Sequence, residues 1–200
     1  MLRQLRPALV MLIGLSVITG LVYPLVITGI AQVAFPWQAG GSIVERDGRP
    51  VGSALIGQNF AGPRYFHPRP SATTEPDPKD ASKTIAVPYA ADNSAGSNLS
   101  PSAKALVDRV KGDAAALHAE NPDAPIPGDL VTTSASGLDP DISPAAAAFQ
   151  IPRVARARGM AEDAVRELVA AHTTPRLFGV FGEARVNVLQ LNLALDAAGK

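Results

Sequence analysis

The sequence predicts an α+β protein, with a single N-terminal transmembrane helix followed by one exported α+β domain. Three observations support this prediction. Residues 7–44 contain no Asp, Glu, Lys, Arg or His, strand-like segments then flank a tight-turn dipeptide, and capped helical patterns recur after residue 100. Pro, at 18 of 200 residues, exceeds its usual share of about 5 per cent, which predicts long irregular segments. We therefore expect a small sheet, about three to four helices and a long ordered Pro-rich loop.

Residues 8–30 are almost entirely apolar, and they set the expected membrane topology. A bilayer core about 30 Å thick needs roughly 20 apolar residues in a helix, so this segment can span once. Arg3 and Arg6 precede it, and basic residues favour the cytoplasmic side. The expected organisation is a cytoplasmic tail (1–7), a transmembrane helix with an outer interfacial anchor (8–36) and an exported domain (37–200).

The same segment permits a second interpretation, a cleaved secretory signal that would release a soluble protein. However, the apolar run exceeds the length of about 7–15 residues that is typical of a signal core. The small-x-small exit Gly29-Ile30-Ala31 also lies deep inside the apolar run. We therefore expect an uncleaved anchor.

Ser16, Gly20, Pro24 and Thr28 recur every fourth residue of the span. They share one small or polar face, and membrane helices associate through such faces. Pro24 removes a backbone donor and leaves the Gly20 carbonyl free, which predicts a kink between these two residues. The alternative is that these residue types are simply ordinary in membrane helices. We expect the face to be a transmembrane partner face.

Beyond the span, Asp47-Gly48 suits a tight hairpin turn between strands over residues 42–46 and 49–56. From residue 57 to residue 100, closely spaced prolines predict neither sustained helix nor strand. The aromatic residues of this segment predict an ordered loop packed on the domain, because disordered segments contain few aromatics.

Two Ser-Pro pairs resemble helix starts, in which Ser caps the first turn and Pro takes the first helical position. Ser100-Pro101 is expected to open an amphipathic helix that docks on the core and stops at Asn121-Pro122. Ser143-Pro144 is expected to open a second helix, interrupted at Pro152 and ended by Gly159. The other expectations are a helix over 161–171, strands over 129–133 and 176–181, a turn over 136–141 and, from an ambiguous pattern, a closing helix over 186–195.

Composition and motifs exclude several classes of site. The net charge is zero and there is no Cys, which argues against a nucleic-acid partner, thiol chemistry and disulfides. The P-loop motif that binds ATP phosphates is missing. His67, His118 and His172 are scattered without the spacing of metal ligands. We therefore assign no catalytic, cofactor-binding or metal-binding residue.

Ser134, Ser136 and Ser143 lie beside Asp139 and Asp141, which brings hydroxyls and carboxylates together in sequence. No Gly-x-Ser-x-Gly elbow accompanies them, and no His is near. Turn and cap roles are therefore expected.

Arg153, Arg156 and Arg158 precede Gly159, where cations complement the dipole of a helix C-terminus. A structural role is expected to outweigh anion binding. The alternative hypothesis is a membrane-anchored periplasmic enzyme that uses these arginines or the Asp and Ser residues of the preceding cluster. It predicts a pocket in which those side chains converge.

Six long strings are spread over nearly the whole chain. They are Leu55-Ile-Gly-Gln-Asn-Phe60, Tyr65-Phe-His-Pro-Arg-Pro-Ser-Ala72, Ser94-Ala-Gly-Ser-Asn-Leu99, Asp129-Leu-Val-Thr-Thr-Ser-Ala-Ser-Gly-Leu-Asp-Pro140, Ile142-Ser-Pro-Ala-Ala146 and Arg185-Val-Asn-Val-Leu-Gln-Leu-Asn-Leu-Ala-Leu195. Together they resemble the C subunit of the Kdp-type potassium-transporting ATPase of bacteria and archaea.

The resemblance implies a non-catalytic subunit in the prokaryotic inner or plasma membrane. Its implied partners are a channel-like potassium-binding subunit, a P-type ATPase subunit and a small single-helix subunit. The resemblance also implies that the subunit acts as a catalytic chaperone, which raises the ATP affinity of the ATPase subunit. ATP would then act through that subunit, and this chain would bind no cofactor independently. The motif residues carried over are Gly57, Gln58, Phe60, Arg69, Pro70, Ser71, Ser97, Asn98, Ser136, Gly137, Asp139, Pro140, Ser143, Pro144, Asn187 and Asn192.

Two positions depart from the family pattern. Asp141 stands where the family often has His, and Ala184 where Pro is common. The Gly57-Gln58 pair resembles nucleotide-binding signatures discussed for the family, but direct ATP contact is not expected because this segment should lie outside the cell.

Overall fold

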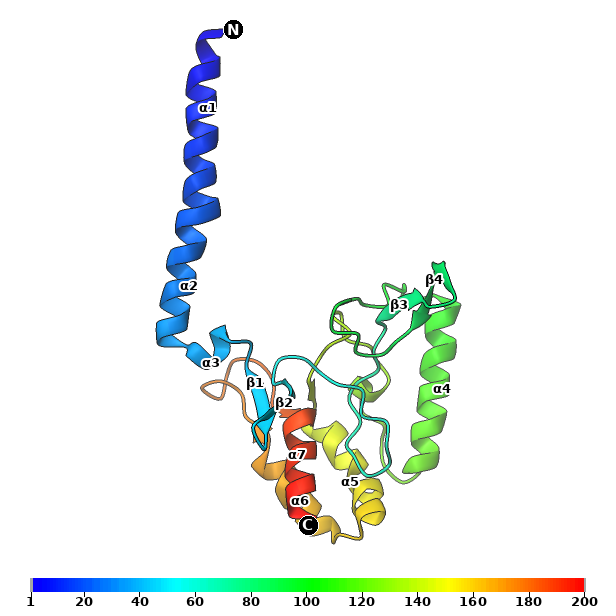
Figure 1. The fold of residues 1–200 in the computed structure, drawn as a ribbon. Helices are drawn as coiled ribbons and strands as arrows, with labels where there is room; N and C mark the ends of the chain where they lie inside the picture. Colours follow the sequence, from blue (N-terminus) through cyan, green and yellow to red (C-terminus); the bar gives the residue numbers. More distant parts are fainter. Residues whose placement is uncertain (1, 200) are drawn as a thin grey trace. The chain divides into compact units, whose positions relative to one another are not determined.

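The computed structural model describes residues 2–199 and shows an α+β protein (Figure 1). The chain divides after Ser53 into two compact units. The first holds the long N-terminal helix and one hairpin, and the second holds the remaining helices and sheets. The α+β class is therefore confirmed.

The long helix of the first unit consists of α1 (Leu2–Val17), a π-helical turn η1 (Ile18–Val22) and α2 (Tyr23–Ala34). Among residues 2–199, Arg3–Ala34 is the one helix that is long and apolar enough to cross a membrane, with a mean hydropathy of 2.3. None of the residues in its most apolar part is buried within the chain. Length and composition therefore fit a single membrane-spanning anchor.

At the position of the predicted kink, near Gly20 and Pro24, the helix contains the π-helical turn η1. The Tyr23 backbone N–H donates to the Ile18 carbonyl, a step of five residues instead of four. Pro24 follows in the first turn of α2, where its missing N–H would otherwise have paired with Gly20. The wider turn thus accommodates the proline within a continuous helix.

A short helix α3 (Pro36–Ala39) and a hairpin complete the first unit. Strands β1 (Ile43–Arg46) and β2 (Arg49–Ser53) pair antiparallel, with Ile43 opposite Ser53. Asp47 and Gly48 have φ values of 54° and 72°, as a tight two-residue hairpin turn requires. The predicted hairpin is confirmed, although its second strand ends at Ser53 and not at residue 56.

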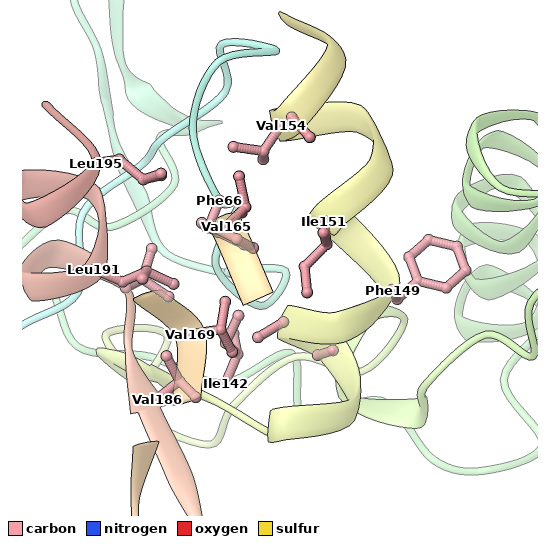
Figure 2. Packing of buried hydrophobic residues seen from close by; sticks show 14 of the residues in the cluster. Phe66, Ile142, Phe149, Ile151, Val154, Val165, Val169, Val186, Leu191 and Leu195 are labelled. Carbon is pink, nitrogen blue, oxygen red and sulfur yellow. The ribbon is translucent and has the colours of Figure 1, made fainter. Parts of the chain in front are cut away.

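The core of the second unit lies between three helices and a small sheet. Helices α5 (Pro144–Arg158), α6 (Glu162–Ala171) and α7 (Val188–Ala198) surround it, with strands β5 (Asp141–Ile142), β6 (Thr173–Thr174) and β7 (Arg185–Asn187). The strands form an antiparallel sheet in the order β5-β7-β6. Figure 2 shows Phe66, from the Pro-rich segment, among side chains of α5, α6 and α7. The Pro-rich segment is therefore part of the core, as its aromatics predicted.

Helix α5 begins and ends as predicted but is not interrupted. The Ser143 hydroxyl accepts from the Ala146 N–H, Pro144 follows the cap, and Gly159 ends the helix with φ 69°. The helix continues through Pro152, so the expected interruption is wrong. An internal proline costs about 3 kcal/mol, while burial of one large aliphatic side chain contributes about 1.5–3 kcal/mol. Several such side chains are buried on this helix, which outweighs the cost.

Helix α4 (Lys104–Glu120) departs from the prediction at its start and in its packing. It starts after Ala103, which provides no side-chain cap, and not at Ser100-Pro101. It stops before Asn121, as predicted. None of its residues is fully buried, and Leu117 packs only partly buried against the core. The predicted docking on the core is therefore limited to the end of the helix.

Three strand predictions need correction. Residues 57–100 do contain a hairpin, β3 (Thr74–Asp77) and β4 (Asp80–Ala86), because a two-stranded ribbon has only edge strands and tolerates Pro76. Residues 129–133 form no strand but a 3₁₀ turn, η2 (Gly128–Leu130), since Asp129 accepts hydrogen bonds from Ser143. The expected strand over 176–181 is a turn with one isolated bridge.

The ambiguous pattern over 186–195 combines two elements. Val186 belongs to β7, and Val188 begins α7. Asn187 joins them by accepting from the Gln190 N–H with its side chain, which caps the helix. The closing helix is confirmed. The strand in front of it explains why the spacing of the apolar residues matched neither a helix nor a strand over the whole segment.

Candidate functional site

Two buried amide side chains hold the backbone of the Pro-rich segment. Asn192 of α7 accepts from the Phe66 N–H at 2.8 Å and donates to the Phe66 carbonyl at 3.0 Å. Gln150 of α5 makes the same pair of bonds with His67, at 2.8 and 3.1 Å. Each amide is 1% exposed. Side chains of α5 and α7 thus hydrogen-bond to the backbone of two consecutive residues, which fixes the segment on the core.

Ser71 and Thr73 bind backbone groups elsewhere in the Pro-rich segment, and Ser71 also binds the turn at Gly137. The Ser71 hydroxyl donates to the Gly137 carbonyl at 2.8 Å and accepts from the Tyr89 N–H at 3.1 Å. The Thr73 hydroxyl donates to Val87 at 2.6 Å and accepts from the Ala90 N–H at 3.1 Å. Both hydroxyls therefore act as bridges between backbones, not as free nucleophiles.

Arg69 and Asp139 form an ion pair with 2.7 Å between Nη1 and Oδ2. The Tyr89 hydroxyl donates to the Arg69 carbonyl at 2.8 Å. Burial, and then the nearby Asp139 charge, raise the pKa of Tyr89 above its usual range. The phenol therefore remains a neutral donor, and it adds a second connection between the same segments.

Gly57 lies where two segments approach each other closely. Its N–H donates to the Leu138 carbonyl at 2.8 Å, and a Cβ atom there would lie 2.4 Å from the Tyr89 ring and 2.6 Å from the Asp139 carbonyl. Only glycine fits, so its place in the motif has a packing explanation. Gln58 follows it, half-buried.

Other motif residues have similar structural roles. Ser97 and Asn98 follow Gly96, whose Cβ position would be 2.9 Å from the Ala135 carbonyl, and Asn98 has φ 50°. The Pro140 carbonyl accepts from the Val188 N–H at 3.0 Å. Asn187 donates to the Ala54 carbonyl at 3.0 Å.

The cluster of serines and aspartates consists of turn and cap residues, as predicted. Ser134 accepts from the Gly137 N–H at 2.8 Å, and Ser136 accepts from the Leu138 N–H at 3.1 Å. Asp139 accepts from the Asp141 N–H at 3.1 Å.

Asp141, which departs from the motif pattern that the resemblance implies, lies at the start of β5. Burial raises the pKa of its carboxyl and Asp139 adds to this, while Arg185 and a hydrogen bond from Asn187 oppose it. Arg185 lies 3.1 Å away and Asn187 3.3 Å away. The carboxylate thus adds side-chain contacts between β5 and two residues of β7.

Two of the three clustered arginines tie helix α5 to the Pro-rich segment. Arg153 pairs with Glu120 at 2.8 Å and donates to the Pro63 and Tyr65 carbonyls at 2.8 and 2.9 Å. Arg158 pairs with Asp196 at 2.9 Å and lies 4.9 Å from the centre of the Tyr65 ring. The structural interpretation is confirmed, but these contacts are with the Pro-rich segment, α4 and α7 and not with the last carbonyls of α5.

The histidines lie apart, and among residues 2–199 no group of three or more His, Asp or Glu could hold a metal ion. His67 approaches the Gly62 carbonyl at 3.0 Å and His172 the Leu168 carbonyl at 2.9 Å. Burial, and then the Arg153 charge, lower the pKa of His67. Its imidazole is therefore neutral at pH 7.

A groove of about 590 Å³ lies between α4 and the Pro-rich segment. The motif residues that line it are Phe60, Arg69, Pro70 and Ser71, and α4 contributes Arg109, Asp113, Ala116, Leu117 and Glu120. Arg109 pairs with Asp113 at 2.8 Å, while its Nε and Nη2 atoms are buried without a hydrogen-bond partner, as is Arg69 Nε. The groove offers a concave surface for a ligand, but none of its lining residues forms a pair of nucleophile and base.

The enzymatic alternative required convergence of Asp139, Asp141, Ser143 and the arginines in a pocket. The structure instead gives these residues cap, turn and tethering roles, and none of them lines the groove. These residues therefore do not form the pocket that this hypothesis predicts.

The structure also identifies contributors that the motif strings did not single out. Gln150, Thr73, Tyr89 and Arg153 each join segments far apart in sequence. One signal for Gln150 was available, because this amide stands between Phe149 and Ile151 in an otherwise apolar helix face. The predicted transmembrane partner face, by contrast, lies on the exposed long helix of the first unit.

Comparison with known families decides what these connected motif residues represent. The family model of the K⁺-transporting ATPase c chain, KdpC, matches residues 5–197. The chain belongs to the KdpC family. This confirms the resemblance seen in the sequence, and it shows that the interconnected residues are those of a KdpC-type chain.

Individual relatives agree over nearly their full length. A potassium-transporting ATPase KdpC subunit of Rhodopseudomonas palustris (strain TIE-1) is 65% identical over 198 residues, covering 99% of this chain and 98% of the relative. The KdpC subunit of Methylorubrum extorquens is 65% identical over 195 residues, covering 98% and 97%. That of Bradyrhizobium diazoefficiens is 63% identical over 198 residues, covering 99% and 98%.

Proposed function

We propose that this chain is a non-catalytic accessory subunit of a high-affinity, ATP-driven potassium uptake pump. One observation carries the proposal: the chain matches the KdpC family over residues 5–197, and residues of the strings that resemble this family connect segments of the second unit. Such a unit is suited to presenting a fixed surface to partner subunits, because a preorganised surface loses little conformational freedom on binding.

The proposed partners are a channel-like potassium-binding subunit, a P-type ATPase subunit and a small single-helix subunit. The chain stabilises their assembly and raises the ATP affinity of the ATPase subunit, while ATP binds only to that subunit. Such an effect needs contacts that differ between two states of the partner. The membrane helix is the proposed route for this coupling, because it lies in the same bilayer as the partners' helices.

The proposed topology is single-pass, in the prokaryotic inner or plasma membrane. Residues 1–7 are cytoplasmic, 8–36 span the membrane and 37–200 are exported. Arg3 and Arg6 support this orientation, because basic residues next to a span favour the cytoplasmic side. The long exposed apolar helix supports the single span.

Affinity purification of the tagged full-length chain from cells that express the complete pump tests the proposal. We expect the channel-like and ATPase subunits to be recovered with the chain in mild detergent. In a pump assembled without this chain, the ATP concentration for half-maximal ATPase activity should rise. Recovery of the chain alone would contradict membership of the complex, and an unchanged ATP dependence would contradict the chaperone role.

The substitution Gly20→Leu tests the proposed partner face of the span. A Cβ at Gly20 meets nothing within 4 Å in the chain, so the helix itself should tolerate the change. A large side chain would keep a partner helix from approaching closely, and we expect a several-fold loss of co-purified subunits. Gly14→Leu is the matched control, because Gly14 is equally unobstructed but lies off the four-residue face. Equal recovery of both variants would mean that the face is not an interface.

A further inference from the structure

The loop between β6 and β7 exposes a group of large apolar side chains. We call residues 175–184 the apolar loop. Leu177, Phe178, Val180 and Phe181 are 62%, 85%, 71% and 65% exposed. Residues 177–182 carry no charge. An uncharged apolar cluster of this kind on a surface marks an interaction site.

The apolar loop has a defined conformation that keeps these side chains outward. Phe178 has φ 53°, a left-handed value that costs a non-glycine residue energy. A bridge joins Leu177 and Phe181, with the Leu177 N–H donating to the Phe181 carbonyl at 2.9 Å. At the base, Arg176 pairs with Glu183 at 2.6 Å. A strained tip held by a bridge and an ion pair is typical of a segment shaped for contact.

Chain connectivity limits how far the apolar loop can lie from the residues that follow the membrane helix. Asn187 of β7 donates to the carbonyl of Ala54, the first residue of the second unit. Ser53, the residue before it, pairs with Ile43 across the first hairpin. The Ile43 carbonyl in turn accepts from the Trp37 ring N–H at 3.0 Å, and Trp is a residue of the membrane interface.

The distances along this path are short. Antiparallel partners such as Ile43 and Ser53 lie about 5 Å apart. Phe181 is six residues from Asn187, which is at most about 20 Å of extended chain. The length of chain along this path therefore permits the tip of the apolar loop to reach a bilayer surface at the level of Trp37.

We propose that the tip of the apolar loop, residues 177–181, inserts into the outer lipid leaflet of the membrane that anchors this chain. The inference rests on the proposed membrane topology. Leu, Val and Phe side chains gain by leaving water for the boundary between headgroups and acyl chains, which lies about 5–10 Å deep for peripheral elements. The bilayer is the apolar phase that the chain itself must enter, because Arg3–Ala34 has the length and composition of a span.

Site-specific fluorescence tests the inference in the assembled pump. The chain has no Cys, so Phe178→Cys accepts a single environment-sensitive NBD label. Val107→Cys on α4 is the matched control, because Val107 is also apolar and exposed. Each labelled full-length chain is purified with its partner subunits and reconstituted in phosphatidylcholine–phosphatidylglycerol vesicles, with and without nitroxide-labelled lipid.

We expect the label at Phe178 to emit at shorter wavelength and to lose fluorescence to the nitroxide lipid, with neither effect at Val107. A shift to shorter wavelength without quenching would show that a protein partner covers the loop, and would overturn the inference. No shift would show that the loop stays in water, and would also overturn it. Recovery of the partner subunits is measured separately, so a failure of the proposed function is distinguished from a failure of the loop inference.

Discussion

Gly137→Ala is expected to destabilise the second unit by about 2–5 kcal/mol. Gly137 has φ +68°, and its Cβ would lie 2.5 Å from the Thr73 methyl and 2.6 Å from the Ala95 carbonyl. The left-handed conformation costs an alanine about 1–2 kcal/mol, and overpacking costs about 1–3 kcal/mol more. The measurement is the free energy of unfolding of the full-length protein in detergent.

Two glycines separate the contributions to this expected loss. Gly159 has φ +69° but nothing within 4 Å of its Cβ position, so Gly159→Ala should cost only the conformational part, about 1–2 kcal/mol. Gly112 lies within α4 with an open Cβ position, so Gly112→Ala should stabilise by up to about 1 kcal/mol. Equal effects of Gly137→Ala and Gly159→Ala would contradict the close approach of Thr73 and Ala95 to Gly137.

Asn192→Leu is expected to cost about 2–5 kcal/mol of unfolding free energy. The change keeps the approximate volume but removes both hydrogen bonds to Phe66, which is fully buried. The backbone N–H and carbonyl of Phe66 would then be buried without hydrogen-bond partners. Each unpaired group costs about 1–3 kcal/mol. Denaturant unfolding of the full-length chain measures the loss. Gln190→Leu on the same helix is the control, because Gln190 is exposed and surface substitutions stay within about 0.5 kcal/mol.

A double-mutant cycle with Gln150→Leu tests whether the two amides act as one grip. They hold adjacent residues, Phe66 and His67, so release by one amide should make the other less effective. We expect the double variant to lose at least about 0.5 kcal/mol less than the sum of the single losses. Strict additivity would show that each residue is held independently.

These effects bear on the proposed role of the chain. The strongest interactions of the second unit join the Pro-rich segment to helices and turns far away in sequence. Such bonds hold an irregular surface in one shape. A pump subunit that acts by contact benefits from this, because ordering a flexible surface on binding would reduce affinity.

The sequence predicted those features that depend on local chemistry. The apolar span, the Asp47-Gly48 hairpin and the caps of α5 each follow from residues that lie next to one another. A long uncharged run, a turn that needs positive φ and a Ser-Pro pair have the same meaning in many folds. The family, too, was recognised from strings read directly in the sequence, and the comparison confirmed it.

Errors arose where tertiary contacts outweighed local preference. Pro152 did not interrupt α5, because burial of its neighbours offsets the missing hydrogen bond. Ser100-Pro101 did not open α4, and the helix lacks any buried side chain. Residues 129–133 form a 3₁₀ turn in place of a strand, and Asp129 there accepts hydrogen bonds from Ser143, the cap of α5. None of these outcomes is encoded in spacing along the chain.

The sequence by itself determined the single apolar helix, the α+β class, the family and the residue types of the motifs. Only the tertiary structure decided what several of the motif residues do, because residues such as Asn192 and Arg69 contact residues dozens of positions away. Asn192 is 126 positions from Phe66, and Arg69 is 70 positions from Asp139. Only folding reveals such pairs, which connect distant segments of the second unit.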